Sequence, residues 1–456
     1  NLTHLRFEWV QPLARAGMYA VFGLMLATGL AIVVGLYYRL SAAIFFVLHT
    51  YVFLVAAEFY LNHAYLISIL AFVMGLVPAH RALSFDGLRK PELQTDEIHA
   101  WPYVVVCALI GIVFTFGSVA KINPDWLAGE PVRHWLDYRA ESAQEPFASW
   151  LRAEWCVYLI AYGGVLYDLL VTPALIWRRT RVYGVLFSVG FHMTNHYLFN
   201  IGVFPWFMLC ATTLFFEPSW PRKLGMWVPS SVAPYVNRAV AWAFAIGATE
   251  RAPADDPLAV SESRKRWILA FSGAFTLLMV AVPLRHYLYP SYVGWTEEGH
   301  VLAWRMKLRD KEGDLSFRIV DKATGERWVL HPNRDANDRQ VRKMVGRPDL
   351  LLYYVHLVAK RYRAEGRDVE IYADSLVSLN FRPKQRLIDP TVDLAAEPNS
   401  LMPYPWLTEF EDTPMRNTVP PVHSHLGATA RRLARRAGPP GTLAPPVRAP
   451  RRIDFR

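Results

Sequence analysis

The sequence predicts a multi-pass α-helical membrane bundle, followed by a soluble, strand-rich α+β domain outside the membrane and a disordered tail rich in arginine and proline. Hydrophobic residues make up 53% and charged residues 19% of the 456 positions, against roughly 45–50% and 25% in soluble proteins. Long apolar runs fill the first part of the chain, strand-like runs follow, and eight arginines lie in the last 30 residues. We therefore expect three regions, 1–290, 291–426 and 427–456.

Apolar segments of about 20 residues, the length needed to cross a bilayer, recur through the first region. Residues 17–38 contain no charged side chain, and 182–216 contains no Asp, Glu, Lys or Arg, which leaves room for two short spans. Further candidates cover 40–57, 59–79, 101–120, 155–177 and 267–284. Any one run fits a buried helix of a soluble protein, but so many in succession predict seven or eight membrane helices.

The positive charges of short loops predict the orientation of the spans. Arg178, Arg179 and Arg181 form the clearest basic loop, which we place in the cytoplasm. Counting spans in both directions from this loop predicts a group of segments on the outer side. These segments are the loops 58–63, 121–154 and 199–203 and everything after residue 285.

The region after residue 290 has the alternating apolar and polar pattern of strands, broken by charged turns. We expect strands at 301–308, 315–320 and 368–373, turns at 311–314 and 322–325, and a helix at 348–364.

The charge and the cysteine content exclude two classes of protein. The tail holds eight arginines and one acid, Asp454, so it carries +7 of the net charge of +10. The rest of the chain is close to neutral, and we therefore expect no nucleic-acid partner. Three cysteines, all in apolar stretches, cannot form a disulfide framework.

Polar residues inside or at the ends of spans are costly, and each one indicates a functional site. Asn62 and His63 open the third span, Lys121 closes the fourth, and His192 and Asn195 lie in the long uncharged run. The predicted orientation places these side chains near the same outer interface. A lysine removed from water can act as a general base, and Asn or His can stabilise the anion that such a base creates.

Each of these residues also has a structural explanation. A lysine at the end of a span usually extends to the lipid headgroups, and a histidine on an apolar helix usually bonds to a carbonyl of a neighbouring helix. Asp168 is expected to pair or to face a water-filled seam, and we assign it no role. His192 and His196 lack the further ligands of a zinc motif, so we expect no metal site.

At these residues the sequence resembles the vitamin K-dependent gamma-glutamyl carboxylase family, in the bacterial branch with a horizontally transferred transmembrane domain. The resemblance spans about residues 17–410, in the order of the family. The matching segments are EFYLNHAYL at 58–66, SVAKINPDWLAG at 118–129, FHMTNHYLFNIGVFP at 191–205, PSWPRKL at 218–224, WTEEGH at 295–300 continuing to Trp304, and QRLIDP at 385–390.

The resemblance implies a reaction and a set of site residues. Lys121 matches the base that deprotonates reduced vitamin K, a phylloquinone or menaquinone hydroquinone, with Asn62 and His63 at the same centre. Addition of O2 then yields a strong base and finally the epoxide. That base removes a γ-proton from a glutamate of a peptide or protein substrate, and CO2 is added. The implied quinone- or substrate-binding residues are His192, Asn195, His300, Trp304 and Arg305.

The sequence departs from the family in three respects. His300 stands where the animal members have a Tyr implicated in glutamate binding, the cysteines of the animal disulfide have no counterpart, and an upstream span is expected to be missing. Three functions therefore stay open: a full carboxylase, a vitamin K hydroquinone epoxidase or oxygenase without peptide carboxylation, and a non-catalytic membrane protein. The expected location is the bacterial inner membrane, with the C-terminal domain outside the cytoplasm.

Overall fold

The computed structural model describes residues 2–4, 7–95, 97–199, 201–245 and 261–414. The predicted tail at 427–456 lies outside the described residues. Helices dominate the first part of the chain. Their bounds are α1 Arg15–Val34, α2 Tyr38–Val55, α3 Asn62–Leu76, α4 Phe85–Arg89, α5 Trp101–Lys121, α6 Pro124–Leu127, α7 Val132–Ala140, α8 Phe147–Arg152, α9 Glu154–Ile176, α10 Arg181–Phe199, α11 Phe204–Thr212, α12 Ala233–Ala245 and α13 Glu262–Leu284.

Five helices of the described chain are long and apolar enough to cross a membrane. They are Arg15–Val34, Tyr38–Val55, Trp101–Lys121, Glu154–Ile176 and Glu262–Leu288, and the shorter apolar helices Asn62–Leu76 and Phe204–Phe215 accompany them. The uncharged run 182–216 is divided between α10 and α11, as its length suggests. Large apolar side chains on the outward surfaces, such as Leu26, Val33 and Leu186, are exposed, as lipid-facing residues should be. The number of seven or eight spans stays a prediction.

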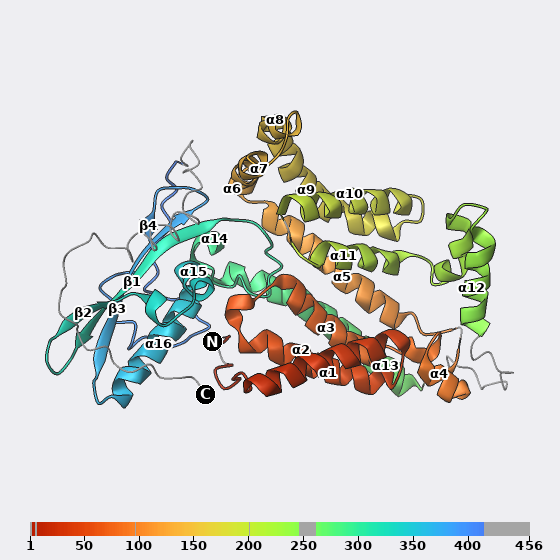
Figure 1. Cartoon of the computed structure of the whole chain (residues 1–456), viewed down its shortest axis with the longest axis horizontal. Coiled ribbons are helices and arrows are strands. Elements are labelled where there is room, and N and C mark those ends of the chain that lie inside the picture. The colour runs from red at the N-terminus through yellow and green to blue at the C-terminus, as the bar shows by residue number, and fades with distance from the viewer. Residues whose placement is uncertain (1, 5–6, 96, 200, 246–260, 415–456) are drawn as a thin grey trace, which may run out of the picture.

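The helices pack as neighbours in sequence and around α5. Helix α5 contacts α9 and α13, α2 contacts both α1 and α3, and α10 lies between α9 and α11. Figure 1 shows these helices side by side, with the sheet at one end of the bundle. Local sequence explains several helix ends: Gly35, with φ of +65°, ends α1, and Pro102 and Pro205 occupy the first turns of α5 and α11.

The second part of the chain is a four-stranded antiparallel sheet with helices against it. The strands are β1 Lys311–Asp321, β2 Arg327–Leu330, β3 Val369–Leu379 and β4 Gln385–Arg386, in the order β2-β1-β3-β4, and the helices are α14 Val293–Thr296, α15 Asp338–Gly346 and α16 Pro348–Ala364. Alternate residues of β3 are buried, and Ile371 packs with Phe317 of β1 and Leu351 of α16 in the core. The structure thus confirms the predicted fold class.

The predicted helix at 348–364 is confirmed as α16, and the strand predicted at 315–320 lies within β1. The strand predicted at 301–308 is wrong. Leu302, Trp304 and Lys307 have φ values of +63°, +54° and +49°, which a strand does not allow, and the segment is irregular. The turn predicted at 311–314 is also wrong, because these residues form the start of β1.

The sheet contacts two of the loops that the charge pattern places on the outer side. Gln340 Nε2 of α15 donates to Glu58 Oε1 over 3.0 Å, and Arg382 pairs with Asp125. These loops therefore lie on the same side of the bundle as the sheet, in agreement with the predicted topology. Which side of a membrane this is stays a prediction.

Candidate active site

Lys121 is the last residue of α5, and its side chain lies inside the helical bundle. Only 8% of the residue is exposed. Its Nζ donates to the carbonyl of Gly117 over 3.2 Å and to Asp168 Oδ2 of α9, and it lies 5.8 Å from the centre of the Trp126 ring. The side chain therefore does not extend to a headgroup region, as a lysine at a span end usually does.

The contact between Lys121 and Asp168 depends on close packing of α5 and α9. A Cβ at Gly117 would lie 2.9 Å from Asp168 Oδ2 and 3.7 Å from the terminal methyl of Met306. The absence of a side chain at position 117 thus makes room for the carboxylate of Asp168. Met306, in the segment that follows α14, also reaches this position. Sequence reasoning assigned Asp168 no role, although an acid within an apolar span was visible.

The segment 302–306 enters the bundle and is bonded to α3. Asn62 at the start of α3 donates from Nδ2 to the carbonyl of Arg305 over 3.1 Å. The hydroxyl of Tyr60 donates to Asn62 Oδ1 over 2.9 Å and accepts from the backbone N–H of Leu302 over 2.8 Å. Trp304 is 1% exposed and stacks on Tyr65, with 4.9 Å between ring centres. Three predicted site residues, Asn62, Trp304 and Arg305, are therefore in one cluster.

His63 and His192 both lie near the ring of one phenylalanine, Phe204. The ring centre of Phe204 lies 5.8 Å from that of His63 and 6.4 Å from that of His192. His192 is 1% exposed, its Nε2 lies 3.2 Å from the hydroxyl of Tyr167, and its buried Nδ1 has no hydrogen-bond partner in the described structure. The pair Lys121 and Asp168 and the group of Tyr167, His192, Phe204 and His63 adjoin at the consecutive residues 167 and 168 of α9, and we call these six residues together the seam.

His300 lies in a buried ionic cluster at the start of the sheet region. Glu297 accepts from Arg309 Nε over 2.6 Å, and Lys311 Nζ lies 3.6 Å from Glu297 Oε1. Burial and the charge of Arg309 hold the pKa of His300 well below its usual value, which favours the neutral imidazole. Burial raises the pKa of Glu297, but the charges of Arg309 and Lys311 outweigh it and hold the pKa well below its usual range.

Arg305 differs from the other cations of this region. The residue is 7% exposed, and its Nε has no hydrogen-bond partner among the described atoms. Burial lowers the pKa of nearby Lys311 to about 8, although Glu297 opposes the change. The cluster thus contains several buried cations around one internal carboxylate, with a guanidinium at its edge that is not fully bonded.

Asn195 is half-buried on α10, one turn beyond His192, and none of the contacts described above reaches it. The next residue, His196, packs against Trp206, with 5.5 Å between ring centres. Within the described residues, no group of three or more His, Cys, Asp or Glu side chains is placed to hold a metal ion.

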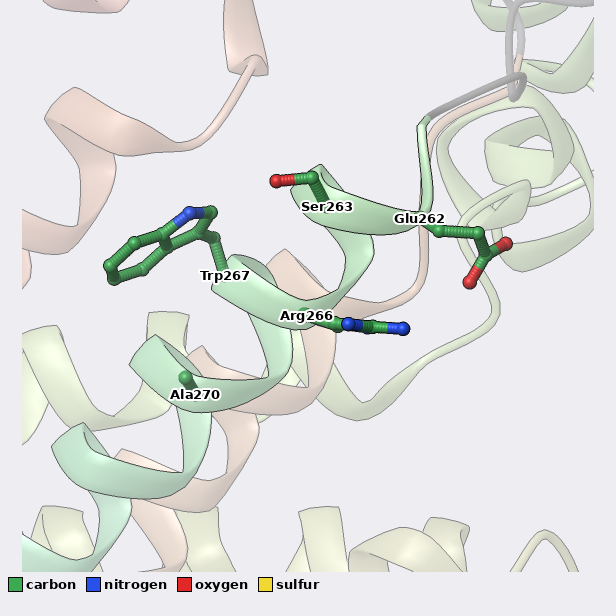
Figure 2. A pocket seen from close by; sticks show the side chains of 5 residues that line it. All are labelled: Glu262, Ser263, Arg266, Trp267 and Ala270. Carbon is green, nitrogen blue, oxygen red and sulfur yellow. The ribbon is translucent and has the colours of Figure 1, made fainter.

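A cavity of about 470 Å³ lies at the start of α13, away from these residues. Its lining comes from a single stretch of that helix. Figure 2 shows Trp267 and Arg266 projecting to different sides of the helix. The lining residues are Glu262, Ser263, Arg266, Trp267 and Ala270. None of these five residues is among those around Lys121 and His192, so the cavity is separate from the seam.

Comparison with known protein families connects the two parts of the fold. Residues 2–220 match the model of the HTTM domain, and residues 264–413 match the model of the vitamin K-dependent gamma-carboxylase, lumenal domain. The first match contains Asn62, Lys121 and His192, and the second contains the segment from His300 to Arg305. No solved structure matches the chain.

Proposed function

Because the chain belongs to the vitamin K-dependent gamma-carboxylase family, we propose that it oxygenates reduced vitamin K to the epoxide and couples this reaction to carboxylation of a peptide glutamate. When bound, reduced vitamin K would supply, through its oxidation by O2, a base strong enough to remove the γ-proton, for which no side chain is basic enough. The observation that carries the proposal is the position of Lys121 Nζ inside the bundle, bonded to Asp168 and close to Trp126.

The residues of the seam have the composition of a site for an aromatic ligand with polar oxygens. Aromatic rings of Phe114, Phe191 and Phe204 surround His192, with 5.3 to 6.4 Å between ring centres. The unpartnered Nδ1 of His192 gives this apolar seam one free hydrogen-bonding atom. Apolar walls with a few placed polar groups are typical of small-molecule sites.

Lys121 is the general base in this proposal, and Asn62 and His63 stabilise the anion that proton transfer creates. To act as the base, the pair must be in its neutral form, with the proton on Asp168 and the lone pair on Nζ. Nζ then takes the hydroxyl proton and becomes an ammonium, which Asp168 and the carbonyl of Gly117 contact. His192, Asn195 and Trp304 complete the binding site for the ring. The low exposure of Lys121 supports this role, because a base within the seam is protected from water.

Arg305 and His300 are proposed to receive the glutamate side chain. The incompletely bonded guanidinium of Arg305 suits a carboxylate, and the backbone of the same residue is held by Asn62. A peptide reaching Arg305 from the sheet would then end one residue from Met306, whose terminal methyl lies close to Gly117, the residue whose carbonyl Lys121 contacts. CO2 is the second substrate of this half of the reaction.

The chain is a membrane protein with an extramembrane domain. We further propose that it resides in a bacterial inner membrane with the sheet outside the cytoplasm. The quinol then enters from the bilayer, in which it dissolves, and the peptide enters from the outer side.

A vitamin K hydroquinone epoxidase without peptide carboxylation is the second candidate. Glu297 favours it, because this internal carboxylate already pairs with Arg309 and Lys311, so these two neighbouring cations are not available to a substrate glutamate. In that case the ionic cluster has a structural role, and only the seam around Lys121 is catalytic.

One assay separates these functions: purified protein with reduced vitamin K, O2, labelled CO2 and a glutamate peptide. Epoxide together with labelled peptide is expected. Epoxide without label would favour the second candidate, and neither product would indicate a non-catalytic membrane protein.

Lys121→Ala should abolish epoxide formation in this assay, because it removes the proposed base. Lys322→Ala is the matched control, since Lys322 lies in the turn between β1 and β2, far from the seam in sequence and partly exposed. Wild-type turnover in Lys121→Ala protein of normal thermal stability would contradict the role of Lys121.

A further inference from the structure

Three hydrogen bonds on α9 and α10 form a chain that ends at a backbone carbonyl. Ser188 Oγ donates to the carbonyl of Gly184 over 2.7 Å, a distance at which two oxygens without a proton between them would repel. Ser188 has a single hydroxyl proton, so it must accept from Tyr167 Oη, which lies 3.0 Å away. Tyr167 has then used its own proton and can only accept from His192 Nε2, 3.2 Å away.

This direction of donation determines the tautomer of His192. A neutral imidazole has one N–H and one lone pair, and the chain places the proton on Nε2. Nδ1 therefore presents its lone pair, and it is the atom that is buried without a partner. An imidazolium would instead bury a charge and an unbonded N–H, and the carboxylate that follows Tyr167 on α9, Asp168, is already engaged by Lys121.

We propose that His192 Nδ1 is a hydrogen-bond acceptor that makes the seam selective for the hydroquinone over the quinone. This inference rests on the proposed function, because it assumes that the ring binds beside His192. A hydroquinone hydroxyl donates to the lone pair of Nδ1, whereas a quinone offers only carbonyl lone pairs, which leave Nδ1 unbonded. Tyr167 and Ser188 act through His192 and are positioning residues.

The selectivity has a functional consequence. The oxidised form of the cofactor has the same size and the same apolar ring, so shape alone separates the two forms poorly. An unpaired buried acceptor is unfavourable enough to give a preference on the order of 10- to 100-fold for the hydroquinone. Oxidised quinone in the surrounding bilayer would then compete weakly for the seam.

Two substitutions test this chain in different ways. Tyr167→Phe keeps the stacking on Phe191, whose ring centre lies 3.9 Å away, but leaves Nε2 without an acceptor, so either tautomer becomes possible. Ser188→Ala frees the hydroxyl proton of Tyr167, which can then donate to Nε2 and move the imidazole proton to Nδ1. We expect the preference to fall to a few-fold in Tyr167→Phe and to shift toward the quinone in Ser188→Ala.

The measurement is the dissociation constant of a menaquinone and of its hydroquinone under anaerobic conditions, for the detergent-solubilised full chain. Tyr162→Phe is the control, because Tyr162 lies on the same helix but bonds to the carbonyl of Leu127. Nitrogen-15 NMR of histidine-labelled protein, with His192→Gln to assign the signal, reports the tautomer without any ligand. We expect the Nε2–H form in the unmodified chain.

An unchanged ratio of dissociation constants in both Tyr167→Phe and Ser188→Ala would overturn the inference, as would a signal of the Nδ1–H form in the unmodified chain. Failure of the unmodified chain to bind either form would instead overturn the proposed function. The two failures are distinguishable, because the NMR result does not depend on ligand binding.

Discussion

The charges of Lys121 and Asp168 are both removed from water, and each compensates the other. A buried ion pair contributes little net stability, because desolvation of both groups offsets their attraction. Loss of one member is different, since the other charge stays buried without a partner. The pair is therefore better explained by the chemistry of the seam than by the stability of the bundle.

We expect Asp168→Ala to lower the free energy of unfolding by about 3–5 kcal/mol, because an unpaired ammonium is left between α5 and α9. The double substitution Lys121→Met with Asp168→Leu should recover most of this loss, since apolar side chains of similar volume replace both ions. Denaturant unfolding in mixed micelles measures both values. A double variant as unstable as the sum of two single losses would show that the charges themselves stabilise the fold.

Sequence reasoning at this scale found polar residues but not their partners. Lys121, Asn62 and His192 were visible because each interrupts an apolar run. The link from Lys121 to Asp168 spans 47 positions and depends on which helices pack together, which the apolar pattern does not specify. Tyr167 was missed for the same reason, because a tyrosine in an apolar span gives no distinct signal.

At the scale of elements, the segment 301–308 shows why a strand pattern can be misleading. Trp304 is buried, but it belongs to the core of the bundle and not to that of the sheet. Its neighbours Ala303 and Arg305 are buried as well, which the alternation of a strand with one exposed face does not predict. Periodicity reports that a side chain is buried and does not identify the surface that buries it. The same pattern correctly predicted β1 and β3, where both neighbours are strands.

The junction between β3 and α6 connects the sheet to the segment that follows Lys121. Arg382 donates to both carboxylate oxygens of Asp125 over 2.9 and 2.7 Å, and Asn380 donates to the same carboxylate over 2.6 Å. Trp126, the next residue, faces Lys121 Nζ. A sequence alone does not reveal this junction, because residues 125 and 382 lie in different regions of the chain.

Arg382→Ala should lower the free energy of unfolding by about 3–5 kcal/mol, because it leaves the buried carboxylate of Asp125 without its bidentate partner. Arg386→Ala is the matched control: its pair with Asp374 has side chains that are 51% and 56% exposed, and such pairs contribute about 0–1 kcal/mol. Hydrogen exchange should increase at α6 and at the end of β3 in the first variant only. Equal effects of the two substitutions would contradict a stabilising junction.

At the scale of the whole molecule, the polar connections between bundle and sheet gather at one end. Glu58 and Asp125 of the bundle contact the sheet there, and the segment 302–306 passes from the sheet into the bundle. The basic loop at Arg178 lies at the opposite end of α9 and pairs with Glu217. The positive charges and the sheet are therefore on different sides of the bundle, which is the arrangement that the charge pattern predicts.

This separation predicts which side chains a membrane-impermeant thiol reagent reaches. In a chain whose native cysteines 107, 156 and 210 are replaced, Lys322→Cys should react from outside in intact cells or right-side-out vesicles, because the proposed topology places the turn between β1 and β2 on the outer side. Arg179→Cys should react only after the membrane is permeabilised, although Arg179 is exposed. The opposite pattern would invert the topology. It would also bring the peptide to the seam from the cytoplasm, whereas the predicted pattern admits substrates that have already crossed the membrane.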